Sequence, residues 1–274
     1  NDFQRTLDPL KLPSAGNNAI KYDYYGNGNG ADWTSNNSNQ YNASNVNYYN
    51  SIGLPVGTTV YDLGAGNDIL DVASSVQSST SKINFIGGDG NDILRGVALG
   101  NSGAGDDRIE TATVGFTYGY GSFTSPQLVR IAGGVGNDTL IASTIAADIA
   151  GGSGNDTITG SSADDVIYGD GYDSVGVIPD QGALADRTFI GWGTVSTSDG
   201  ADIISAGAGN DWVNAGGGDD TVDGGTGNNT IYGGAGNDTI TTADGNDLIY
   251  GDDLNSTLTG NDTINPGAGD NVIY

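Results

Sequence analysis

Apolar residues recur at every ninth position along much of the chain, each after a turn-like run of Gly, Asn and Asp. The pattern is clearest at residues 197–250, where six nine-residue units follow one another without a gap. The sixth place of each unit holds Asp or Asn, and the eighth holds Val or Ile. A helix cannot contain this much glycine, because each interior Gly costs about 1 kcal/mol relative to Ala. The pattern therefore predicts short strands joined by tight turns and stacked as a solenoid.

Several units also carry Gly in their first, second and fourth places, namely GGDGNDILR (87–95), GGVGNDTLI (133–141), GGSGNDTIT (151–159) and GGAGNDTIT (233–241). These units resemble the glycine-rich nonapeptide of the RTX family, G-G-x-G-x-D-x-U-x, where U is a large apolar residue. The resemblance covers most of residues 54–274. It implies an all-β fold, a right-handed parallel β-roll in which two nonapeptides make one coil. It also implies that calcium lies between turns stacked on the same side.

The composition of the turn itself favours calcium. Glycines at the first, second and fourth places allow positive φ, so several carbonyl oxygens can point inward, and the sixth-place Asp adds a carboxylate. Mixed hard oxygen ligands in a compliant loop suit Ca²⁺ better than Mg²⁺, which requires a rigid octahedron. We therefore expect several calcium ions. The candidate carboxylate ligands are Asp68, Asp92, Asp107, Asp138, Asp156, Asp165, Asp202, Asp211, Asp220, Asp238, Asp247 and Asp262, aided by turn carbonyls such as those of Gly87, Gly133, Gly151, Gly224 and Gly233.

The 18-residue coil sorts these positions onto two sides. Asp138 and Asp156 are one coil apart, so they are expected to lie one above the other. Ala147 occupies the sixth place on the opposite side, and we expect its turn to be metal-poor. Asn229 and Asn271 depart from the motif, because an amide oxygen brings no charge to a calcium site.

The chain divides into a Tyr- and Asn-rich segment, residues 1–53, and a roll of about a dozen coils, residues 54–274. We interpret the first segment as an N-terminal cap or arm, because solenoid ends expose apolar surface and strand edges. Insertions are expected near residues 111–123, 169–196 and 251–256, where the repeat is interrupted.

The charge balance also indicates bound cations. The chain has 34 acidic and 8 basic residues, for a formal net charge of −26, and every acidic residue except Glu110 is Asp. Such charge together with 48 Gly opposes folding unless counterions bind. Metal binding would then supply folding free energy. We expect a chain that is unfolded at low calcium and folded outside the cell, secreted and possibly at the cell surface.

Several functional classes are disfavoured. The chain has no His and no Cys, which removes His-dependent triads, thiol catalysis and the usual zinc sites. The adjacent carboxylate pairs that could suggest glycoside hydrolysis mostly fall in the fifth and sixth places of the repeat, where calcium ligation already accounts for them. Nucleic acid is an unfavourable partner at this charge, and no apolar run is long enough for membrane insertion.

The sequence therefore predicts a protein that is not an enzyme, a calcium-folded structural or adhesive module of a surface layer, adhesin or filament. Its partners would be Ca²⁺, other copies of itself or cell-surface polysaccharide. Two alternatives remain open. The roll could be the accessory folding and secretion part of a secreted hydrolase or polysaccharide-modifying enzyme. It could also be a carbohydrate-binding module that uses the N-terminal tyrosines or the loop at residues 170–196.

Overall fold

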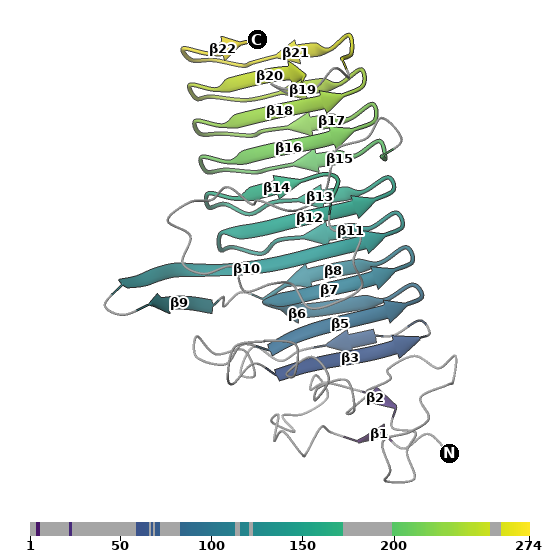
Figure 1. The fold of residues 1–274 in the computed structure, drawn as a ribbon. Helices are drawn as coiled ribbons and strands as arrows, with labels where there is room; N and C mark the ends of the chain where they lie inside the picture. The colour runs from purple at the N-terminus through teal and green to yellow at the C-terminus, as the bar shows by residue number, and fades with distance from the viewer. Residues whose placement is uncertain are drawn as a thin grey trace.

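Two parallel β-sheets form the body of the molecule in the computed structural model (Figure 1). The structure describes residues 4–5, 22–23, 59–65, 67, 69–71, 83–112, 116–120, 123–171, 199–252 and 259–274. Within these residues all regular structure is β-strand, and successive strands alternate between the two sheets. The predicted parallel β-roll is confirmed.

The longer sheet, sheet 1, runs in the order β22-β20-β18-β16-β14-β12-β10-β7-β5-β3. Its strands are β3 (Thr59–Ala65), β5 (Ile83–Asp89), β7 (Leu99–Ala104), β10 (Phe123–Val135), β12 (Ala147–Ser153), β14 (Val166–Tyr168), β16 (Trp212–Gly217), β18 (Thr230–Ala235), β20 (Leu248–Asp252) and β22 (Val272–Ile273).

The second sheet, sheet 2, runs in the order β21-β19-β17-β15-β13-β11-β8-β6-β4. Its strands are β4 (Ile69–Asp71), β6 (Ile93–Val97), β8 (Arg108–Thr111), β11 (Thr139–Ile141), β13 (Thr157–Thr159), β15 (Ile203–Ser205), β17 (Thr221–Asp223), β19 (Thr239–Thr241) and β21 (Thr263–Asn265).

The register between strands follows the sequence period. Val213 of β16 pairs with Ile231 of β18, and Val222 of β17 pairs with Ile240 of β19, so one coil takes 18 residues. All four are fully buried eighth-place residues. The core is consequently one thin layer of Val, Ile, Leu and Phe side chains between the sheets, as the nine-residue apolar pattern predicted.

Aromatic rings form a row along sheet 1 near its C-terminal end. The ring centroids of Tyr168 and Trp212 are 4.9 Å apart, and those of Trp212 and Tyr232 are 5.7 Å apart. Tyr232, Tyr250 and Tyr274 then stack at 4.8 Å per step. This step is the spacing of neighbouring strands, so the sheet sets the ring separation and the rings in turn stabilise the register.

Sheet 1 has ten strands in its parallel series within the described residues, where the sequence suggested about a dozen coils for the whole roll. Interruptions of the repeat take up part of the chain. One of them, in the expected region 111–123, contains β9 (Phe116–Tyr120), which pairs antiparallel with the first part of β10.

The other predicted segments fall largely outside the described residues. Of residues 1–53 only β1 (Gln4–Arg5) and β2 (Tyr22–Asp23) are described, as an antiparallel pair. The expected insertions at 169–196 and 251–256 are described only at their margins, to residue 171 and to residue 252. The cap and the two insertions remain predictions.

Neighbouring residues of β15 provide a matched test of the core. Ile204 is 1% exposed between the sheets, whereas Ile203 is 58% exposed on the outside. Replacing Ile204 with Ala should lower the stability of the calcium-loaded roll by about 2–5 kcal/mol, because it leaves a cavity. Ile203→Ala should change it by about 0.5 kcal/mol or less. Urea unfolding at saturating calcium measures both, and equal effects would contradict this register.

Candidate calcium sites along the edges of the roll

Sixth-place carboxylates line the edge where the chain passes from sheet 1 to sheet 2. We call this the acidic edge, and its members are Asp92, Asp107, Asp138, Asp156, Asp202, Asp220, Asp238 and Asp262. The backbone N–H of each residue donates to Oδ1 of the next one along the roll, over 2.6–3.0 Å. As the 18-residue period predicted, Asp156 lies one coil from Asp138 and is bonded to it. The ladder uses one oxygen of each carboxylate.

The second oxygen of these carboxylates is buried without a donor at several positions. Within the described residues, the Oδ2 atoms of this edge that have no hydrogen-bond partner include those of Asp138, Asp156, Asp202, Asp220 and Asp238, and Oδ2 of Asp247 on the opposite edge also has none. Leaving a buried polar atom unsatisfied costs about 1–3 kcal/mol, and more when it is charged. Cations bound along this row of oxygens would offset that cost.

The carbonyl of the next coil lies beside these oxygens. A Cβ built on Gly133 would meet Oδ2 of Asp138 and would lie 2.5 Å from the carbonyl oxygen of Gly151. A Cβ on Gly233 would meet Oδ2 of Asp238 and the carbonyl oxygen of Gly251 in the same way. A carboxylate oxygen and a carbonyl oxygen therefore converge on the first place of the turn. This is the mixed oxygen donor set that suits Ca²⁺.

The turn glycines serve two different purposes. The second- and fourth-place glycines, such as Gly134 and Gly136, have φ values of 110° and 137°, a region that favours Gly. First-place glycines such as Gly133 are not among the positive-φ residues. The positive φ that glycine allows is thus used at the second and fourth places, whereas at the first place the absence of a side chain leaves room for the carboxylate.

The opposite edge, where the chain returns to sheet 1, is less uniform. Its sixth-place ladder runs through Ala147, Asp165, Asp211, Asn229, Asp247 and Asn271, with N–H to Oδ1 distances of 2.7–3.0 Å. We call it the mixed edge. The one side-chain oxygen of Asn229 accepts the ladder hydrogen bond from Asp211 N–H, so the side-chain atom that faces the turn is the amide nitrogen.

This nitrogen changes the turn that begins at Gly224. A Cβ on Gly224 would lie 3.5 Å from Nδ2 of Asn229, with Ile231 and Thr242 side-chain carbons closer. The structure thus places no carboxylate at Gly224, which the sequence grouped with the other turn glycines. Asn271 likewise directs its amide nitrogen to the carbonyl of Pro266, 2.8 Å away.

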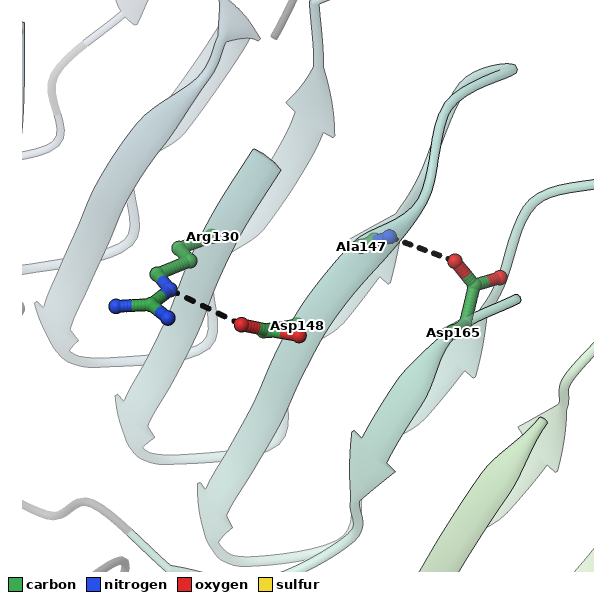
Figure 2. A network of polar contacts seen from close by, with 4 residues as sticks. All are labelled: Arg130, Ala147, Asp148 and Asp165. Carbon is green, nitrogen blue, oxygen red and sulfur yellow. Dashed lines mark hydrogen bonds and ion pairs between the residues drawn. The ribbon is translucent and has the colours of Figure 1, made fainter. Parts of the chain in front are cut away.

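Toward its N-terminal end the mixed edge becomes apolar. Ala98, Val129 and Ala147 are fully buried, and β10 pairs Val129 with Ala147. The metal-poor turn predicted at Ala147 has no side-chain oxygen at its sixth place. Figure 2 shows that its N–H instead donates to Asp165, while the adjacent Asp148 forms a buried ion pair with Arg130 at 3.0 Å.

Asp165 differs from the other predicted ligands. Its Oδ1 accepts from Ala147 N–H at 2.7 Å, and its Oδ2 accepts from Ser161 N–H at 2.5 Å. The protein itself therefore satisfies both oxygens. Ser161 stands in the second place of this turn, where most turns have Gly, so the sequence did contain a signal for this difference.

A second, exposed ladder runs through the fifth places and was missed in the sequence. The N–H of Asn155 donates to the side-chain oxygen of Asn137 at 2.8 Å, and that of Asn228 donates to Asn210 at 2.9 Å. Here the acceptor belongs to the preceding coil, whereas in the sixth-place ladder it belongs to the following coil. The repeated Asn-Asp pair thus ties each turn to both neighbours.

Burial dominates the electrostatics of the acidic edge. Desolvation raises the pKa of Asp138, Asp202 and Asp238 from 3.8 to about 7 and that of Asp156 to about 9. Neighbouring carboxylates of the same edge raise these pKa values further, while the ladder hydrogen bonds lower them. These carboxylates are costly to ionise in the roll unless a cation accompanies them.

Within the described part of the chain, no group of three or more His, Cys, Asp or Glu side chains surrounds one metal position. This fits the geometry, because the sixth place of a turn contributes at most one carboxylate and the other ligands of the repeat would be backbone carbonyls. Carboxylate and carbonyl oxygens are the donors that suit calcium. The same residues contain no helix long and apolar enough to span a membrane.

One predicted ligand, Asp68, lies outside the described residues. The turn that contains Asp202 also begins at a different residue from the one predicted. A Cβ on Gly169 would meet Oδ2 of Asp202 and the carbonyl oxygen of Ala215, so the turn starts at Gly169 and not at Thr197. The interruption of the repeat falls inside this turn.

A family model described as the RTX calcium-binding nonapeptide repeat matches six segments of the chain, residues 84–98, 130–144, 148–171, 196–231, 223–258 and 258–273. A search of curated proteins and a search of solved structures each found no match.

Adjacent carboxylates in one turn test the assignment of the ligands. Asp220 is a buried sixth-place residue, whereas Asp219 is an exposed fifth-place residue that accepts from Asn237. Asp220→Asn keeps the ladder oxygen but removes the charge, so we expect the calcium-loaded chain to lose at least one bound ion by native mass spectrometry. Asp219→Asn should retain the full number. Equal calcium content in the two variants would refute the assignment.

The raised pKa values predict how the calcium-free chain responds to pH. The folded pKa values lie above the ordinary 3.8, so folding takes up protons. The cost of burying these carboxylates is absent below about pH 4, grows through pH 7 and is complete above about pH 9. Without calcium, β structure in circular dichroism should therefore increase as the pH falls from 9 to 5. Saturating calcium should flatten this dependence, and a metal-free chain that loses β structure on acidification would show the sign to be wrong.

Proposed function

Because residues 84–273 carry RTX calcium-binding nonapeptide repeats, which bind Ca²⁺, we propose that this protein is a calcium-folded extracellular structural or adhesive module whose sixth-place carboxylates hold the ions. The observation that carries the proposal is the row of buried Oδ2 atoms without donors along the acidic edge. At Asp138 and Asp238, for example, this Oδ2 atom lies beside the carbonyl oxygen of the first-place residue of the next coil.

In this proposal, the binding of calcium is coupled to the folding of the chain. The buried carboxylates of one edge repel one another, and the whole chain carries a net charge of −26. The core that opposes this repulsion is a single layer of side chains. Ions that bridge consecutive coils neutralise the carboxylates and join the coils at the same time, so their binding free energy becomes folding free energy.

The extracellular assignment follows from the ligands. A turn that offers one carboxylate and several neutral carbonyls resembles the weaker end of protein calcium sites, where dissociation constants are about 10⁻⁴–10⁻³ M. Such sites fill in a calcium-rich exterior and empty in a calcium-poor interior. The fold would therefore form after the chain leaves the cell.

A structural role fits the described surface better than catalysis. The regular coils repeat the same ladders and the same core, and His and Cys are absent from the sequence. In the aromatic row on sheet 1, Tyr250 is stacked between Tyr232 and Tyr274, which covers the ring faces that a sugar would need there. The residues proposed for carbohydrate contact, the N-terminal tyrosines and the loop at 170–196, lie almost entirely outside the described residues.

A calcium titration tests this function. Starting from a metal-depleted sample, the midpoint of β-structure formation should lie at about 10⁻⁴–10⁻³ M free calcium. Magnesium at the same concentration should not substitute, because the turns do not provide a rigid octahedron. A midpoint in the micromolar range or below would contradict an extracellular trigger.

The adhesive or structural part requires its own assay. The calcium-loaded chain should associate with itself, seen by light scattering during size-exclusion chromatography, or should bind cell-surface polysaccharide on a glycan array. Monomers that bind no glycan would leave calcium-dependent folding intact but would refute this part of the proposal.

A further inference from the structure

Asp170 occupies a place in its turn that most of the other turns give to glycine. It follows first-place Gly169, and the corresponding second-place residues of neighbouring coils are Gly152 and Gly216. Its side chain is only 7% exposed. A carboxylate at this place is not part of the repeat and was not among the ligands predicted from the sequence.

The carboxylate of Asp170 points along the roll toward the next coil. Its Oδ2 accepts from the N–H of Gly217 at 2.5 Å, and a Cβ on Gly216 would meet the same oxygen. In the regular coils this position is taken by a second-place carbonyl, since a Cβ on Gly234 would meet the carbonyl of Gly216. Asp170 Oδ2 thus replaces a backbone acceptor at the coil where the repeat is interrupted.

The other carboxylate oxygen of Asp170, Oδ1, is buried and has no hydrogen-bond partner. The adjacent turn position holds a second such atom, because Oδ2 of Asp202 lies against Gly169, the residue bonded to Asp170. The carbonyl oxygen of Ala215 meets the same place. Two unpartnered carboxylate oxygens and a carbonyl are therefore brought to one turn.

We propose that Asp170 is an additional calcium ligand that gives the turn of Gly169 and Asp202 two carboxylates and makes it the tightest calcium site of the roll. This inference rests on the proposed function, because it assumes that Asp202 binds calcium. More ligand charge raises calcium affinity. The ion bound here joins the coils on either side of the interruption and is the first to bind as calcium rises.

The surrounding charges act in the same direction. The negative charges of Asp202, Asp199 and Asp220 repel the buried carboxylate of Asp170. A divalent cation offsets this repulsion, whereas a purely structural replacement for a carbonyl would not need a charge.

Asp252 supplies the matched control. It stands in the same second place after the same residues, Ile-Tyr-Gly, where the repeat is interrupted again. Its Oδ1 accepts from the N–H of Gly260 at 2.8 Å, so that carboxylate ties down the returning chain. Asp252 is also less buried than Asp170. Its role is local capping, and no second calcium carboxylate is assigned to it.

The test compares Asp170→Asn and Asp252→Asn in the full chain, titrated with calcium against a competing chelator. Asn keeps an acceptor for Gly217, and circular dichroism at saturating calcium verifies that both variants fold. Asp170→Asn should weaken the tightest class of sites by about tenfold or more, since ligand charge tunes calcium affinity over such ranges. Asp252→Asn should leave that class unchanged. Unchanged tight binding in Asp170→Asn, or equal weakening in both variants, overturns the inference.

A second readout separates ligation from a distant charge effect. Tb³⁺ replaces Ca²⁺ at oxygen sites, and its luminescence lifetimes in H₂O and D₂O count bound waters. In the tightest site, Asp170→Asn should add about one water, which replaces the lost carboxylate oxygen. Weaker binding without an added water would show that Asp170 is not a ligand.

The inference and the proposed function can fail separately. If Asp220→Asn lowers the calcium content while Asp170→Asn changes nothing, the inference fails and the proposed function stands. If neither variant changes calcium binding, the proposed function fails.

Discussion

The structure depends on how each sixth-place carboxylate divides its two oxygens. Oδ1 accepts a backbone N–H from the neighbouring coil, which fixes the coil spacing, and this bond keeps the side chain inside the turn. Oδ2 is then held in the interior beside the next carbonyl, as at Asp138, with no protein donor. Proteins rarely leave buried carboxylate oxygens unsatisfied. The same bond that builds the roll therefore creates its demand for calcium.

The two edges meet this demand differently along the roll. Within the described residues, the acidic edge carries carboxylates from Asp92 to Asp262, whereas the mixed edge is apolar at Val129 and Ala147 and has its sixth-place carboxylates from Asp165 onward. The N-terminal coils are thus joined by ions on one side and by apolar contacts on the other. On the mixed edge of the C-terminal coils the candidate ligands are Asp211 and Asp247, because the protein satisfies both oxygens of Asp165, and Asn229 and Asn271 use their one side-chain oxygen in the ladder. Calcium dependence should therefore be strongest toward the C-terminal end of the roll.

Much of this fold could be predicted because the nine-residue period fixes the register. The buried eighth places follow from the spacing, whereas the 18-residue coil, and with it the stacking of Asp138 on Asp156, was implied by the resemblance to the RTX nonapeptide. Spacing could not show the opposed Asn ladder, because that ladder depends on which neighbour each side chain reaches. It also could not show that Gly169 opens the turn of Asp202, since the interruption separates them in sequence. Asp165 and Asp170 depart from the other Asp residues for a local reason, a non-glycine second place, that single-position motifs do not weigh.

Removal of calcium from the folded chain tests the central claim most directly. Far-UV circular dichroism and small-angle X-ray scattering would be recorded on one sample before and after exhaustive chelation at neutral pH, then after calcium is restored. The account predicts that chelation abolishes the β spectrum and expands the chain toward unfolded dimensions, and that added calcium reverses both changes. A chelated chain that keeps its β spectrum and compact size would show that the buried carboxylates do not need the ion.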